Sequence, residues 1–278
     1  MPSLVDYLLL SPCQSRDDFI MDTKRCPVCH LPQRHPQLPK PRTPAIIGLT
    51  KLRGGQMDTN ILAVCGSPIR GGNMEAFLNE AIKSARRMGG VNVDMIQLAG
   101  KHIEDCRHCN WCLTRQEEGK FCAIKDDMSE IYPKILAADA LLLATPTYIT
   151  RLSGYLATFL DRFRCLILGK HYRGAMKGKV GGALTVAWMR NAGLETTLLS
   201  VISSMLMWSM VVVTPGEGTC PFGAAGLSSD QGTGKADPED KLGVLKDETG
   251  LRSARTLGER IVETTRILKA GREALKQA

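Results

Sequence analysis

Residues 60–73 read NILAVCGSPIRGGN. Five apolar residues, 61–65, are typical of a buried parallel strand, and a polar glycine-rich loop follows at 66–73. The next apolar residues recur at helical spacing: Phe77, Leu78, Ala81, Ile82, Ala85 and Met88. This strand–loop–helix order places free N–H groups and a positive helix end at the loop, which suits a phosphate. The loop matches neither GxGxxG nor the P-loop pattern, and a plain strand-to-helix turn is the alternative.

The same alternation continues along the chain. Further apolar runs predict strands at 91–98, 140–144, 180–186 and 210–214, with helices between them and a last helix at 249–276. This pattern predicts an α/β fold with a doubly wound, five-stranded parallel sheet. In the flavodoxin-like strand order 2-1-3-4-5, the loops after strands one, three and four meet at the carboxyl edge, where ligands bind. Residues 215–240 are rich in Gly, Ser and Asp and predict a long mobile loop.

A cysteine-rich segment, 106–122, interrupts the pattern between the second strand and the next helix. Cys106, Cys109 and Cys112 are separated by two residues each, and Cys122 follows after nine more. Such spacing lets sulfurs turn toward one point, as a four-cysteine metal site or an iron–sulfur cluster requires. Zinc binding and free thiols are the alternatives.

Composition excludes several classes of protein. The chain has 278 residues, a formal net charge of +8 and no Lys/Arg block with interleaved aromatics, so nothing indicates nucleic-acid binding. The longest apolar run, 198–213, contains four serines and is too short for a membrane span. Ten cysteines without a recognisable secretion signal favour a cytoplasmic, reducing environment and clustered metal-binding thiols.

Residues 1–56 differ from the remainder, because they hold eight of the 14 prolines and show no strand or helix period. We expect a disordered extension, and a start of translation at Met57 is a further hypothesis. Cys26, Cys29, His30 and His35 allow a haem-attachment or zinc site as alternatives.

Residues 57 to about 213 resemble the NADPH-dependent FMN reductase branch of flavodoxin-like proteins, and most of all the iron–sulfur flavoproteins of anaerobic microbes. The motifs that carry the resemblance run in order through the chain: Gly66-Ser67-Pro68, Gly72-Asn73, the cysteine segment leading into Lys125–Met128, Ala138–Ala140, Thr145–Tyr148, Asp161–Phe163 and Gly193–Thr197.

The resemblance implies the site residues. The phosphate of FMN would be held by Ser67, Ile69, Arg70, Asn73 and Met74. The isoalloxazine ring would lie against Pro146, Thr147, Tyr148 and Ile149 on one side, and against Trp188, Asn191 and Gly193 on the other. A [4Fe–4S] cluster would be held by Cys106, Cys109, Cys112 and Cys122. The last cysteine gap is longer than usual in the family, which leaves Cys220 as a substitute for Cys122, whereas Cys65 is expected at a strand end and Cys165 in a helix.

These expectations describe an FMN-dependent oxidoreductase that passes electrons between a ferredoxin-like donor and a small acceptor, with both carriers at one crevice. NAD(P)H is a further possible donor. The alternatives are a cluster-free NAD(P)H-dependent FMN or quinone reductase and a non-catalytic zinc module. The resemblance also implies a homodimer or homotetramer, and no side chain is expected to act as a nucleophile.

Overall fold

The computed structural model describes residues 58–216, 220–235 and 239–277. Cys26, Cys29, His30 and His35, and with them the expectations for residues 1–56, lie outside this part. Within it, no helix is both long and apolar enough to cross a membrane.

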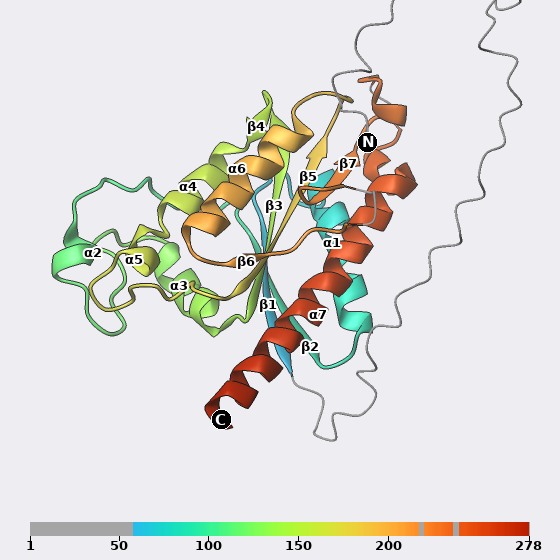
Figure 1. Cartoon of the computed structure of the whole chain (residues 1–278). Helices are drawn as coiled ribbons and strands as arrows, with labels where there is room; N and C mark the ends of the chain where they lie inside the picture. The colour runs from blue at the N-terminus through green and yellow to red at the C-terminus, as the bar shows by residue number, and fades with distance from the viewer. Residues whose placement is uncertain (1–57, 217–219, 236–238, 278) are drawn as a thin grey trace, which may run out of the picture. The chain divides into compact units, whose positions relative to one another are not determined.

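A mainly parallel sheet forms the centre of the fold, and its strands run in the order β2-β1-β3-β5-β6 (Figure 1). The order 2-1-3-4-5 is therefore confirmed for the main strands. The sheet has seven strands rather than five, because β4 pairs antiparallel with β3 and β7 pairs parallel with β5. The strands are β1 (Thr59–Cys65), β2 (Val91–Gln97), β3 (Ala140–Tyr148), β4 (Arg151–Leu152), β5 (Val180–Ala187), β6 (Val211–Val212) and β7 (Ala224–Leu227).

The expected fifth strand is in fact split. Val211 and Val212, which form β6, pair with the start of β5. Later in the chain, β7 pairs with the end of β5. β7 and the 3₁₀ helix η2 (Asp230–Gly232) lie inside 215–240, where one long mobile loop was expected, so this stretch is not a loop throughout.

Helices cover both faces of the sheet. The remaining elements are α1 (Asn73–Arg87), α2 (Trp111–Thr114), α3 (Met128–Ala137), α4 (Gly154–Asp161), α5 (Arg164–Ile167), α6 (Leu194–Met207), η3 (Gly243–Lys246) and α7 (Glu248–Gln277). In Figure 1, α1 and α7 lie together on one side of the sheet, and α3, α4 and α6 lie on the other. Pro133 lies inside α3 without ending it.

The strand pleat divides the core into two layers, because alternate residues of a strand face opposite sides. Leu62, Val64 and Leu141 pack in the cluster that includes α3, α4 and α6, whereas Ile61 and Ala63 pack with α1 and α7. Gly258 permits the close approach of α7 to α1, since a Cβ there would lie 2.1 Å from the carbonyl oxygen of Ala81. This sandwich fixes the carboxyl ends of β1, β3 and β5 at one edge.

Candidate functional site

The main pocket lies at this edge and has a volume of about 670 Å³. Nine of the residues expected to bind FMN line it: Ser67, Ile69, Asn73, Met74, Pro146, Thr147, Tyr148, Ile149 and Trp188. Arg70, Asn191 and Gly193 do not. The three loops singled out from the sequence therefore meet around one cavity, as the strand order requires.

Two N–H groups of the loop between β1 and α1 are already hydrogen-bonded, and the donors left for an anion are those of the first turn of α1. The hydroxyl oxygen of Ser67 accepts the N–H of Ile69 at 3.1 Å, and the Glu75 carboxylate accepts the N–H of Gly71 at 2.8 Å. The first N–H groups of a helix have no acceptor within the helix, so the first turn of α1 offers donors and a partial positive charge at the pocket.

Asn73 connects this loop to a distant part of the chain. Its side-chain oxygen accepts the N–H of Val244 at 3.0 Å, and its side-chain nitrogen donates to the carbonyl oxygen of Lys241 at 3.2 Å. Arg70 instead donates to the carbonyl oxygen of Ala99 at 2.7 Å, outside the pocket lining. Asn73 thus fixes the 241–244 segment beside the loop, and Arg70 holds the loop against the chain segment that follows β2.

The hairpin between β3 and β4 forms another wall. Ile149 and Thr150 adopt left-handed backbone conformations, with φ of 47° and 62°, which are unfavourable for β-branched residues. Thr196 donates a hydrogen bond of 2.7 Å to the carbonyl oxygen of Thr150, and a Cβ on Gly193 would lie 2.6 Å from the Thr150 Cα. The absence of a side chain on Gly193 therefore permits the hairpin to pack closely against it, and Gly193 lies outside the pocket lining.

Sequence reasoning missed four lining residues: Gly72, Val186, Ser228 and Lys241. Gly72 directly adjoins the predicted Asn73, and Val186 lies two residues before the predicted Trp188, so both could have been included. Ser228 comes from the segment 215–240, read as a mobile loop, and Lys241 follows it directly; a tertiary contact with Asn73 holds the Lys241 backbone beside the pocket. No local sequence signal marks either of them.

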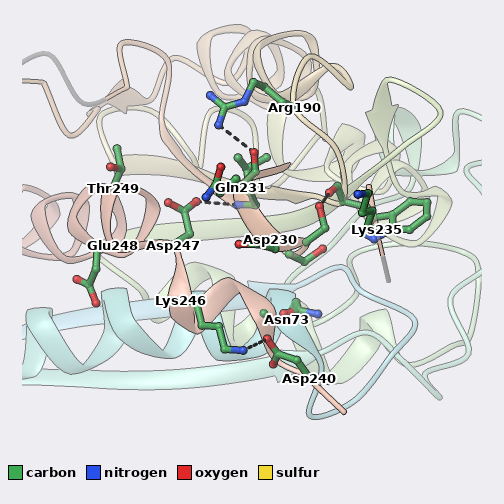
Figure 2. A pocket seen from close by; sticks show the side chains of 15 residues that line it. Asn73, Arg190, Asp230, Gln231, Lys235, Asp240, Lys246, Asp247, Glu248 and Thr249 are labelled. Atoms are coloured by element: carbon green, nitrogen blue, oxygen red, sulfur yellow. Dashed lines mark hydrogen bonds and ion pairs between the residues drawn. The ribbon is translucent and has the colours of Figure 1, made fainter. Parts of the chain in front are cut away.

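A second cavity, the charged pocket, adjoins the main pocket and has a volume of about 680 Å³ (Figure 2). The two cavities share Asn73, Trp188 and Ser228. Figure 2 shows acidic and basic side chains around it, among them Arg190, Asp230, Lys235 and Asp247. Most of this wall comes from the segment between β7 and the start of α7.

The ends of the cysteine segment are fixed by a buried ion pair. Arg162 and Asp126 form a salt bridge with side chains that are 1% and 0% exposed. The Asp126 carboxylate also accepts the N–H groups of Glu104 and Met128, and Arg162 donates to the Glu104 carbonyl oxygen at 2.7 Å. Burial raises the pKa of Asp126, but the hydrogen bonds from Arg162 and from the two N–H groups, together with the Arg162 charge, outweigh burial and hold that pKa below its ordinary value.

The four predicted ligand thiols do not form a metal site, although Cys112 lies close enough to Cys122 and Cys106 for both of these thiols to raise its pKa. Nowhere in 58–216, 220–235 or 239–277 do three or more His, Cys, Asp or Glu side chains come together as a metal site would need. Cys106 lines one surface cavity, with Leu160 and Arg164, and Cys122 lines another, with Phe121. All four are free thiols, and Cys109 is exposed between two residues of left-handed backbone, His108 and Asn110. The donor chemistry fits a cluster, whereas the present side-chain positions do not gather it.

The nine residues between Cys112 and Cys122 form a packed insert rather than a loose loop. Gln116 is 2% exposed, and its nitrogen donates to the carbonyl oxygens of Phe121 and Cys165 at 2.9 and 3.0 Å. Its oxygen accepts the N–H groups of His171 and Tyr172, each at 3.0 Å. The Phe121 ring stacks between Tyr132 and Tyr172, with centroids 4.9 and 4.4 Å away.

Cys165, not Cys220, is the additional thiol beside this segment. Burial raises the pKa of Cys165 to about 12, and the neighbouring thiols of Cys122 and Cys112 contribute to the rise. Burial also raises the pKa of Cys220, where the contributing charge is that of Glu195. The expectation that Cys220 substitutes for Cys122 is not supported by this placement, whereas the positions of Cys65 at the end of β1 and Cys165 in α5 are confirmed.

The cysteine segment and the main pocket are separate sites on one chain. In Figure 1, α2 lies at the left edge beyond α5, whereas β4 and β7 lie at the top. No residue of 98–127 lines the main pocket. The expectation that both would share one crevice is therefore not met within a single chain.

Comparison with known proteins identifies the family to which this fold and sequence belong. The family model for NADPH-dependent FMN reductases matches residues 59–224. An iron–sulfur flavoprotein of Methanocaldococcus jannaschii is 35% identical over 209 residues, which cover 75% of this chain and 98% of the relative. An NAD(P)H dehydrogenase (quinone) of Bradyrhizobium diazoefficiens is 30% identical, covering 71% of this chain and 93% of the relative.

Among solved structures, the flavin-intermediate complex of RosB aligns with a TM-score of 0.55 at 15% identity, covering 79% of this chain and 88% of that one, and supports the fold alone. Together with the edge position of the main pocket, the family match decides the assignment. The chain belongs to the NADPH-dependent FMN reductase family and is a flavin-dependent oxidoreductase.

Proposed function

We propose that this oxidoreductase binds FMN in the main pocket and a [4Fe–4S] cluster at the cysteine segment, and passes electrons between a donor and a small acceptor. The single observation that carries the proposal is the main pocket, where the donors of the 67–75 loop and the apolar residues of two other loops meet at the carboxyl edge of the sheet. When bound, FMN supplies one- and two-electron chemistry and a cluster supplies one-electron transfer.

In this proposal, the residues of the main pocket bind and orient the FMN. The N–H groups at the start of α1, with Ser67, would hold the phosphate, and Lys241 would add a positive charge. Tyr148, Ile149 and Trp188 are 43%, 91% and 51% exposed, so they present apolar surface to a flat ring and would gain by covering it. No side chain is assigned as an acid, base or nucleophile.

The cysteine segment supports the cluster through its chemistry and its scaffold. Rotation about a single torsion moves a cysteine sulfur between staggered positions. Ligation would therefore need side-chain rotation in a segment whose ends are held by Asp126 and whose insert is held by Gln116. The iron–sulfur name of the 35% identical relative points the same way. We assign Cys106, Cys109, Cys112 and Cys122 as the ligands.

Anaerobic purification tests the proposal. We expect brown protein with about four iron and four sulfide per chain, and FMN released on denaturation. Cys109→Ala should lose the iron and keep FMN, whereas Cys220→Ala, the matched control outside the segment, should keep both. Iron content that is unchanged in Cys109→Ala would refute the ligand assignment.

A cluster-free NAD(P)H-dependent FMN or quinone reductase is the second candidate. It is favoured by the completeness of the main pocket without any residue of 98–127 and by the quinone dehydrogenase relative. Yellow, iron-free protein that oxidises NADPH would establish it. Zinc in place of iron would mark a structural metal, but the family assignment rules out a non-catalytic module for the whole chain.

The donor and the assembly belong to the same proposal. A ferredoxin-like protein would deliver electrons to the cluster, and NAD(P)H would deliver them to the flavin. A homodimer or homotetramer is supported by exposed apolar side chains on α6, where Leu206 and Met207 are 59% and 64% exposed. Light scattering of the FMN-loaded protein measures the assembly, and a monomer would refute it.

A further inference from the structure

The main pocket has a single charged residue in its described lining, and this residue is Lys241. The other lining residues are apolar residues, glycine, hydroxyl residues and one asparagine. Lys241 is exposed, and it has no ion pair within the described part of the chain. It also lies beyond residue 224, where the family match ends. The positive charge of the pocket therefore comes from the C-terminal part of the chain and not from the matched core.

The backbone around Lys241 is held on both sides. Asp240 and Lys246 form an ion pair of 2.7 Å across this segment (Figure 2). Val244 is 0% exposed and packs in the core cluster that contains α1 and α7. A Cβ on Gly243 would lie 2.3 Å from the carbonyl oxygen of Ser228, so the segment packs closely against the residue that follows β7. These contacts give Lys241 a fixed place at the pocket.

Asn73 joins this segment to the start of α1. Its side-chain nitrogen donates to the carbonyl oxygen of Lys241 at 3.2 Å, and its side-chain oxygen accepts the N–H of Val244 at 3.0 Å. Asn73 is also the first residue of α1, where the N–H groups of the first turn have no acceptor within the helix. The resemblance assigned Asn73 to the FMN phosphate, whereas both polar atoms of its side chain bind the 241–244 backbone. One hydrogen bond thus separates the Lys241 backbone from the proposed phosphate position.

We propose that Lys241 makes the main pocket select a phosphorylated flavin, and that Asn73 is a positioning residue that holds Lys241 at the start of α1. This inference rests on the proposed function, in which FMN binds in the main pocket. A phosphate beside the first turn of α1 would gain a charge-assisted hydrogen bond from the Lys241 ammonium group. Riboflavin carries a neutral hydroxyl in place of the phosphate and would gain little from the same ammonium group.

The other charges near the loop do not replace Lys241. Arg70 donates to the carbonyl oxygen of Ala99 at 2.7 Å and does not line the pocket. Glu75, in the first turn of α1, accepts the N–H of Gly71 at 2.8 Å and places a carboxylate beside the same loop. Without Lys241, a phosphate at the start of α1 would lie near a carboxylate, with no cation in the pocket lining. The charge of Lys241 therefore decides whether a phosphate is favoured there.

Titration of the full-length protein, freed of flavin, with FMN and with riboflavin tests the inference through the change in flavin fluorescence. In Lys241→Gln, we expect FMN binding to weaken by about tenfold and riboflavin binding to stay unchanged. Lys241→Arg should keep the preference for FMN. Lys177→Gln, the same charge change on an exposed residue outside the pocket lining, should alter neither affinity. Added salt should weaken FMN binding more in the wild type than in Lys241→Gln, because salt screens an exposed charge.

A double variant tests the role of Asn73. If Asn73 acts through Lys241, Asn73→Ala should weaken FMN binding but not riboflavin binding, and Asn73→Ala combined with Lys241→Gln should bind FMN no more weakly than Lys241→Gln alone. If Asn73 instead binds the phosphate independently, the two losses would multiply. Multiplied losses would overturn the positioning role.

The wild-type protein separates this inference from the proposed function. A wild type that binds neither flavin refutes the proposed function. Normal FMN binding in the wild type, with FMN affinity unchanged in Lys241→Gln, refutes the inference alone. Equal losses of FMN and riboflavin affinity in Lys241→Gln would mark a structural effect and would also overturn it.

Discussion

Replacing Gln116 by Leu should destabilise the insert that carries Cys122. The change removes four hydrogen bonds made by one buried side chain. A typical internal hydrogen bond contributes about 1 kcal/mol net, and an abandoned buried partner costs about 1–3 kcal/mol. The carbonyl oxygens of Phe121 and Cys165 lie in the interior, whereas His171 is exposed and its N–H can turn to water. We therefore expect a loss of about 4 kcal/mol.

The substitution Gln116→Glu separates the contribution of the two accepted hydrogen bonds from that of the two donated ones. Glutamate keeps an acceptor for the N–H groups of His171 and Tyr172 but, when ionised, cannot donate to Phe121 and Cys165. It should lose the two donated bonds and bury a charge beside two carbonyl oxygens. Gly169→Ala tests the same site from the other side, since a Cβ there would lie 2.1 Å from the Gln116 side-chain oxygen.

Urea unfolding, followed by far-UV circular dichroism, measures the global loss. Hydrogen exchange of residues 112–122 measures the local one, because a surface insert can open without global unfolding. Faster exchange confined to the insert, with lower iron content after reconstitution, is the expected pattern. A Gln116→Leu protein with unchanged exchange and less than about 1 kcal/mol of lost stability would refute the reasoning.

Two further variants probe other parts of the structure. Arg162→Met leaves the buried Asp126 carboxylate without its partner and should cost about 3–5 kcal/mol at pH 7. Because Arg162 lowers the pKa of Asp126, the stabilisation from this ion pair is present above the ordinary aspartate pKa of about 3.9 and is lost as pH falls through the lowered value. Guanidinium unfolding should therefore show a smaller loss of stability in Arg162→Met at pH 3 than at pH 7. An equal loss at both pH values would contradict this. Ile149→Asn should stabilise the apoprotein by about 1 kcal/mol, because asparagine tolerates the left-handed backbone and the isoleucine side chain is 91% exposed. Thermal unfolding measures the gain, and Ile69→Asn, an exposed isoleucine of the same pocket without a positive φ, should show none.

The sequence was sufficient for the parts of the fold that depend on local periodicity. Nearly all residues of β1, β3 and β5 are buried on both faces, so these strands read as mainly apolar runs and were predictable, and the flavodoxin-like pattern supplied their order. The three loops around the main pocket followed from that order, whereas the resemblance to the FMN reductases implied the nine expected residues that line it. The edge strand was not predictable, because β7 consists of Ala224-Ala225-Gly226-Leu227, which has little β-propensity and is held by pairing with β5.

The remaining differences come from tertiary contacts. Gln116 and Phe121 lie in a polar, charged stretch that reads as a solvated loop, and their burial depends on residues 165–172 folding over them. Lys241 reaches the main pocket only because Asn73 binds its backbone. The separation of the cysteine segment from the pocket depends on how the chain packs between β2 and α3, which spacing along the chain does not encode.

The interruption of the edge strand gives this fold a way to diversify. β6 and β7 each pair independently with β5, so the chain between them, and the chain from β7 to α7, can change in length without shifting the central strands. Doubling such a connection costs only about 0.6 kcal/mol in closure entropy. The residues of these connections, which line the pockets, can therefore change in evolution without altering the central strands and with little loss of folding stability.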